Sequence, residues 1–153
     1  MNALSTTTII VLSANTLTAV LSAALLMLVL WQAPHQRANQ MFAFCMLVLT
    51  VYSGINGFSR FIEFLNVDPH TVFYLTASFY GIFVGAMFFF AAEFAQTNTP
   101  TVRAMKIIGV VQAGVQGVAL WSGNVMTNIR PTEAHNGDFR VDYTMVGLLI
   151  TGT

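Results

Sequence analysis

The fold class is decided by residues 72–96, which read VFYLTASFYGIFVGAMFFFAAEFAQ. This run holds one charged residue, Glu93. At a rise of about 1.5 Å per residue, a helix of this length crosses the roughly 30 Å of hydrocarbon in a bilayer. A run this long and this apolar is typical of a transmembrane helix rather than of a core helix in a soluble domain. We therefore predict a membrane span over residues 72–96.

The composition of the whole chain agrees with a membrane protein. Of its 153 residues, 56% are hydrophobic and 8% are charged, whereas soluble domains carry about 25% charged residues. This composition excludes an ordinary soluble domain and a disordered chain. Six basic residues balance six acidic ones, and they form no basic stripe. We therefore expect the lipid bilayer, and not nucleic acid, as a partner.

Three further runs are long and apolar enough to span a membrane, namely residues 8–31, 41–58 and 102–121. The second of them continues into residues 58–65, where Arg60 and Glu63 stand among aromatic and aliphatic residues. Residues three apart are neighbours on one helical face. We therefore predict a helix extension that lies near the membrane surface.

The predicted fold class is all-α, an integral membrane helical bundle of four full spans plus the start of a fifth, in one domain over residues 1–153. The fifth apolar run opens at about Thr144, and roughly ten residues are too few to cross a bilayer. We therefore expect the chain to be the front of a longer protein. The longest polar stretch, residues 122–143, is expected to be a solvated outer loop, or one that covers a pocket or contacts a partner.

The sequence constrains the orientation of the spans in the membrane less firmly than it constrains their number. Three basic residues fall on each side of the predicted membrane, so the count of Lys and Arg does not orient the chain. The first seven residues carry neither Lys nor Arg, which disfavours a secretory signal peptide. The uncharged N-terminus and the short loops favour an extracytoplasmic N-terminus, in a multi-pass protein of the cell inner (plasma) membrane.

Small and polar residues inside the spans are candidates for helix contacts. Gly81 and Gly85 lie four apart, which leaves a flat patch where another helix can approach closely. Gln112 and Gln116 share one face of the fourth span, and Asn15 lies in the first. Because amides inside a bilayer need hydrogen-bond partners, we predict that these three residues line the bundle interior. Contact with a ligand is the alternative for the two glutamines.

Glu93 is the one acidic residue inside an apolar run. Carboxylates within a membrane are costly and often functional. Glu93 lies one turn from the predicted cytoplasmic end of its span, so it can reach Arg103 or Lys106 across the short loop. We predict a cytoplasmic charge contact among these three residues, with proton transfer or a signalling contact as alternatives.

The chain carries no recognisable catalytic motif: a Gly-rich phosphate loop, a CxxC pair and an HExxH pattern are all absent. A parent chain could carry a kinase or another output domain, so the question of enzyme activity stays open.

All three histidines, His35, His70 and His135, fall in predicted loops. This position disfavours a haem held between spans. Lys106, the only lysine, lies at the mouth of its span rather than deep within it, which disfavours a bound retinal. The single cysteine, Cys45, is expected to be a buried structural thiol. We predict no catalytic or metal-binding residue and name no cofactor.

Two short motifs resemble one family, the N-terminal seven-transmembrane region of bacterial histidine kinases. Residues 88–97 read FFFAAEFAQT, an aromatic, small, Glu, aromatic pattern that ends a span before basic residues open the next one. Residues 124–131 read NVMTNIRP and are followed by NGDF at 136–139, which is similar to the outer loop of that family. The run MVGLL at 145–149 would then open the fifth span.

The resemblance implies an extracytoplasmic N-terminus and a sensory role, in which a signal shifts the packing of the helices and passes to a cytoplasmic output domain. Three of the family's seven spans are missing or cut here, and no phosphoacceptor or ATP-binding region is present. The alternative is a small structural transmembrane subunit of a larger respiratory or photosynthetic complex. On either interpretation we expect other membrane helices, or a second copy of the chain, as partners.

Overall fold

The computed structural model describes residues 5–33, 35–95, 99–133 and 139–145. Within these residues, four helices are long and apolar enough to cross a membrane. They are α1 (Thr6–Gln32), α2 (Arg37–Phe58), α4 (Pro69–Phe94) and α5 (Pro100–Trp121). The prediction of four long apolar helices is confirmed, and their length and composition fit membrane spans.

Three of these helices begin at a side-chain cap rather than at the first apolar residue. Ser5 caps α1 and Thr99 caps α5, each accepting a hydrogen bond from a backbone N–H three residues later. Asp68 caps α4 by accepting from the backbone N–H groups of His70 and Thr71, and Pro69 occupies the first helical position. Caps of this kind satisfy N–H groups that have no partner within the helix, so α4 begins three residues before the predicted apolar run over 72–96.

The Asp68 carboxyl lies outside the membrane-spanning segment and is held in its charged form. The Thr71 hydroxyl and the backbone N–H groups of Thr71 and His70 donate to it, and they lower its pKa below the ordinary value. Hydrogen bonds to a charged carboxylate favour that form over the neutral one.

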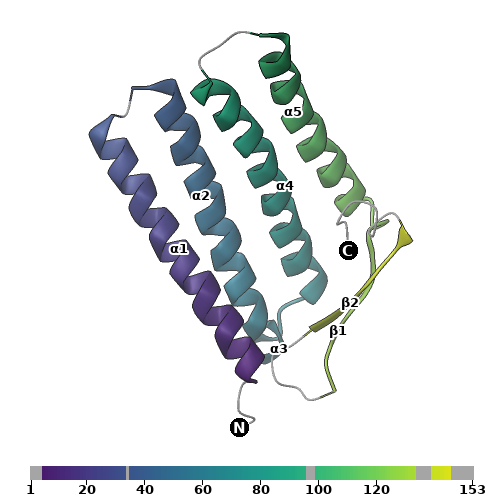
Figure 1. The fold of residues 1–153 in the computed structure, drawn as a ribbon. Helices are drawn as coiled ribbons and strands as arrows, with labels where there is room; N and C mark the ends of the chain where they lie inside the picture. Colours follow the sequence, from purple (N-terminus) through teal and green to yellow (C-terminus); the bar gives the residue numbers. More distant parts are fainter. Residues whose placement is uncertain (1–4, 34, 96–98, 134–138, 146–153) are drawn as a thin grey trace.

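The four long helices lie side by side in chain order, as a single layer rather than a closed bundle (Figure 1). α1 packs on α2, α2 on α4, and α4 on α5. In their most apolar stretches, 28% of residues are buried in α2 and α4, 17% in α5 and only 6% in α1. Most of the apolar surface therefore faces outward, where the hydrocarbon of a bilayer can cover it.

Residues 58–65 continue helically after α2, in part as predicted. They form a 3₁₀ turn (Ser59–Phe61) and a single α-helical turn, α3 (Ile62–Leu65). The segment ends at Asn66, whose φ of 54° is left-handed, a conformation that Asn adopts more readily than most residues. The Glu63 side chain lies outside the described part of the structure, so its expected neighbourhood with Arg60 stays a prediction.

A β-hairpin stands where the sequence analysis expected only an outer loop. Strand β1 (Met126–Pro131) pairs antiparallel with β2 (Phe139–Tyr143). The signal was alternation, because apolar Phe139, Val141 and Tyr143 alternate with charged residues, a period of two that indicates a strand. The all-α prediction therefore holds for the spanning part alone. The fifth run is described only as far as Met145, and its remainder lies outside the described residues.

Candidate functional site at the α4–α5 contact

The backbones of α4 and α5 touch at two glycines. A methyl group on Gly85 would lie 2.8 Å from the carbonyl oxygen of Gly109, and one on Gly109 would lie 2.9 Å from that of Gly85. Contacts this short exclude any side chain larger than hydrogen at either position. The predicted packing patch of α4 therefore packs against α5, where Gly109 is the partner of Gly85. Gly109 stands four residues before Ala113, a spacing that could have identified it.

Gln116 fills the space that Gly81 leaves open. A methyl group on Gly81 would lie 2.9 Å from the amide carbon of Gln116. The Gln116 amide donates to the Ala77 carbonyl of α4 at 3.2 Å, and its side chain is nearly buried, at 7% exposed. Gln112 donates to the Gln116 amide oxygen at 3.5 Å. Gln116 thus bonds between helices, while the bond of Gln112 runs along its own helix.

Asn15 lies in a separate contact, between α1 and α2. Its side-chain oxygen accepts a hydrogen bond from the Asn56 amide at 3.1 Å. About two turns further along the helices, the Ser22 and Thr50 hydroxyls share a hydrogen bond of 2.9 Å. The structure does not bring Asn15 together with the two glutamines, because α1 and α5 stand at opposite ends of the row (Figure 1). The sequence analysis did not identify Asn56 or Thr50.

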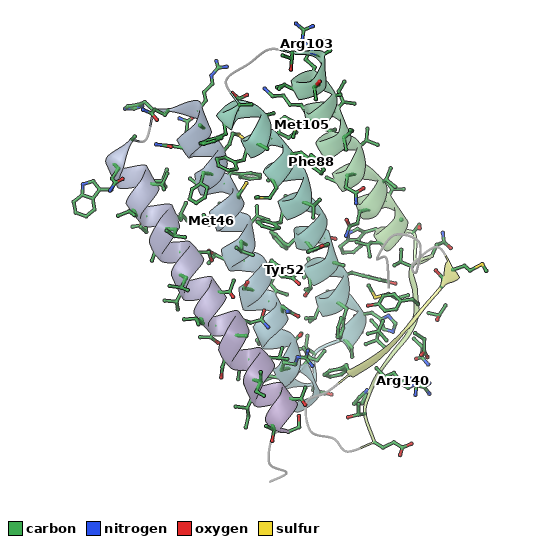
Figure 2. The ribbon with its side chains drawn as sticks, in the orientation of Figure 1. Met46, Tyr52, Phe88, Arg103, Met105 and Arg140 are labelled. Carbon is green, nitrogen blue, oxygen red and sulfur yellow. The ribbon has the colours of Figure 1, made fainter. Side chains whose placement is uncertain are left out.

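An ion pair closes one end of the α4–α5 contact. The Lys106 ammonium lies 2.5 Å from a Glu93 carboxylate oxygen, and both side chains are partly exposed, at 36% and 26%. The pair joins the last turn of α4 to the second turn of α5. Arg103 lies one turn before Lys106, exposed at the N-terminal end of α5 (Figure 2). Of the two basic residues predicted to contact Glu93, Lys106 forms this ion pair.

A small hydrophobic cluster closes the other end. Val125 is fully buried, and Leu120, Met126 and Ile129 pack with it. Phe73 of α4 packs against this cluster and meets Phe139 of the hairpin, with ring centroids 5.9 Å apart. The hairpin is therefore not only a solvated loop, since it is anchored on the first turns of α4.

Two polar aromatic contacts support the same end. The Trp121 indole N–H donates to the Ser78 hydroxyl at 3.0 Å, and the Tyr74 and Trp121 rings lie 5.9 Å apart. Tyrosine and tryptophan are typical of the depth at which a membrane meets water. The α5 helix thus contacts α4 at its C-terminal end, along its middle and at its N-terminal end.

The described residues offer no cluster of three His, Cys, Asp or Glu side chains that could hold a metal ion. His35 lies in the turn between α1 and α2, and His135 lies outside the described residues. His70 was predicted in a loop, and that is wrong, because the cap at Asp68 places it in the first turn of α4. Cys45 is fully buried against Met46 and Ala86, which confirms the prediction of a buried thiol.

Comparison with protein-family models, curated proteins and solved structures gives no match to this chain. The function is therefore inferred from the residues and their geometry.

Proposed function

We propose that the chain is a membrane-embedded sensory input module, similar to the N-terminal seven-transmembrane region of bacterial histidine kinases. It lies in the inner membrane with its N-terminus outside. That orientation puts the β-hairpin outside and the Glu93–Lys106 ion pair at the cytoplasmic face. A signal received at the hairpin passes along α5 to the cytoplasmic end, where an output domain reads it.

One observation carries this proposal: α5 contacts α4 through three different kinds of interaction at three heights. The hydrophobic cluster around Val125 holds the hairpin end. In the middle, Gly85 touches Gly109 and Gln116 donates to the Ala77 carbonyl. The Glu93–Lys106 ion pair holds the other end. Gly85 and Gly109 present no interlocking side chains, so a shift of 1–2 Å between the helices at this level is opposed chiefly by the Gln116–Ala77 hydrogen bond two turns away. A displaced hairpin would therefore change the ion pair on the far side of the membrane.

The proposal is tested by perturbing one end and measuring the other. In full-length protein with Cys45→Ala, spin labels are attached at the exposed positions Phe94 and Ile107. Replacing Phe139 by Ala removes its contact with Phe73. We expect the distance distribution between the labels to shift by about 1–2 Å or to broaden.

The matched control is Tyr143→Ala, which removes an aromatic ring from the same strand outside the buried cluster. It should leave the label distances as in the parent protein. If Phe139→Ala and Tyr143→Ala give the same distribution, the contact is a rigid scaffold and the sensor proposal fails.

The alternative, a structural subunit of a larger membrane complex, has its own supporting observation. The most apolar stretch of α1 is only 6% buried, so this helix offers a long face to another protein or to lipid. Gentle purification from native membranes separates the two proposals. A stable particle with other subunits favours the structural role, whereas a chain that carries its own output domain favours the sensor.

A further inference from the structure

An apolar groove crosses one face of the row of helices. It has a volume of about 340 Å³ and is lined by α2, α4 and α5. Its floor is the Gly85–Gly109 contact, where the absence of side chains leaves a depression between taller neighbours. Phe44, Ile82 and Ala113 are among its walls. No charged side chain lines this part of the groove.

The groove continues toward the end of the row that carries Lys106. A neighbouring hollow of about 330 Å³ is lined by Lys106, Ile107 and Val111, and it shares Phe89 and Val110 with the first. The two hollows therefore form one groove that is apolar over most of its length and ends at an ammonium group. We refer to the two together as the glycine groove.

The glycine groove fits within one leaflet of a bilayer. On α4 its lining residues run from Ile82 to Phe89, about 10 Å at the helical rise. Half of the hydrocarbon core is about 15 Å thick. A lysine one or two turns inside a span can extend its ammonium to the level of the lipid headgroups. Its apolar part thus lies at acyl-chain depth and its charged end at headgroup depth.

The charges at this end of the row are unbalanced in favour of an anion. Arg37 begins α2, and Arg103 and Lys106 lie in the first two turns of α5, at the same end of the row. Among the described residues, Glu93 is the one acidic residue at this end. Glu93 occupies one of the three N–H donors of the Lys106 ammonium. The remaining donors, and the excess positive charge, suit a phosphate group.

We propose that the glycine groove binds an anionic phospholipid, with one acyl chain over Gly85 and Gly109 and the phosphate at Lys106. This inference concerns binding alone, so it does not depend on the sensory function. Lys106 is thereby shared between the lipid phosphate and Glu93, which links the lipid composition of the leaflet to the ion pair between α4 and α5.

The experiment uses the full-length protein in nanodiscs of phosphatidylcholine and phosphatidylglycerol in equal amounts. After mild detergent extraction, the lipids that remain bound are counted by native mass spectrometry. We expect phosphatidylglycerol to be retained about fivefold over phosphatidylcholine, the effect of one basic residue at an anionic surface. Replacement of Lys106 by Gln should abolish this preference, whereas Glu93→Gln should increase it, because the ammonium then loses its competing carboxylate.

A purely structural ion pair predicts a different result, since Lys106→Gln and Glu93→Gln would then act in the same direction. The apolar part is tested by Val110→Trp, which fills the groove, against Val118→Trp, a lipid-facing position on the same helix that is 74% exposed. Only Val110→Trp should reduce lipid retention.

Equal retention of the two lipids by the parent protein overturns the proposal, as does an equal effect of the two tryptophan variants. If the occupant is a second copy of the chain, the same spectra will show a dimer that Val110→Trp dissociates, with no preference between lipids. That outcome also overturns the proposal.

Discussion

The α1–α2 contact and the α4–α5 contact both join neighbouring antiparallel helices, but they use different chemistry. Side-chain hydrogen bonds hold α1 to α2 within the span, at Asn15–Asn56 and Ser22–Thr50. Between α4 and α5 the middle is backbone against backbone at Gly85 and Gly109. A hydrogen-bonded side chain fixes the register of two helices, whereas touching glycines allow close approach without fixing it. The first contact is therefore suited to a static frame, and the stretch of the second from Gly109 to Lys106, beyond the Gln116–Ala77 hydrogen bond, to a movable one.

The largest effect is expected from a substitution that separates α4 from α5. Gly85→Leu would force a side chain into the Gly109 carbonyl, where even a methyl group would lie at 2.8 Å. Overpacking of this kind costs about 3 kcal/mol. The loss is measured as a lower free energy of unfolding in mixed micelles, followed by circular dichroism.

The matched control is Gly114→Leu on α5, because no atom lies within 4 Å of a methyl group placed there. Leucine is also a better helix former than glycine, by up to about 1 kcal/mol, so this variant should be as stable as the parent or slightly more so. Equal losses at the two glycines would show that the effect does not come from the α4–α5 contact.

A smaller effect is expected at the α1–α2 contact. A double-mutant cycle of Asn15→Ala and Asn56→Ala should give a coupling energy of about 0.6 kcal/mol, the average for hydrogen bonds between membrane helices. Thr16→Ala is the control, because the exposed Thr16 hydroxyl bonds only to the Leu12 carbonyl of its own helix. A coupling energy of zero between the two asparagines would remove the distinction drawn between the two contacts.

The sequence predicted the spans well and their partners poorly, for a physical reason. Long apolar runs are recognised from their length and composition, and their identity does not depend on any other helix. Which residues meet depends on the rotation and register of each helix, so Asn56 gave no signal of its own, and the spacing of Gly109 and Ala113 did not say which helix they meet. Likewise Arg103 and Lys106 lie one turn apart, and spacing alone could not decide which of them pairs with Glu93.

The β-hairpin was missed because charge outweighed periodicity in the interpretation of residues 122–143. The charged side chains of the hairpin do lie at its surface, as Arg140 shows (Figure 2). Arg130 and Arg140 both approach Asp142, at 3.3 and 3.7 Å. Phe139 and Val141 pack against the buried cluster that contains Val125 and Ile129, and α4 packs against the same cluster. A two-residue period amid charged residues is therefore the signal that identifies an anchored hairpin here.

The smallest effect is expected at the N-terminal caps of the helices. A hydroxyl caps α1, whereas a carboxylate caps α4. The Asp68 pKa is lowered in the folded protein by the Thr71 hydroxyl and the neighbouring N–H groups. Its contribution to stability is therefore fully present above the ordinary carboxyl pKa near 4 and is lost as the pH falls through the lower folded value.

Asp68→Asn keeps a good cap without a titrating group. Unfolding measured between pH 5 and about pH 2.5 should show a shallower loss for Asp68→Asn than for the parent. Thr71→Val, which removes only the hydroxyl donor, should fall between them. Identical slopes in all three proteins would mean that the α4 cap is no more sensitive to pH than the Ser5 cap of α1.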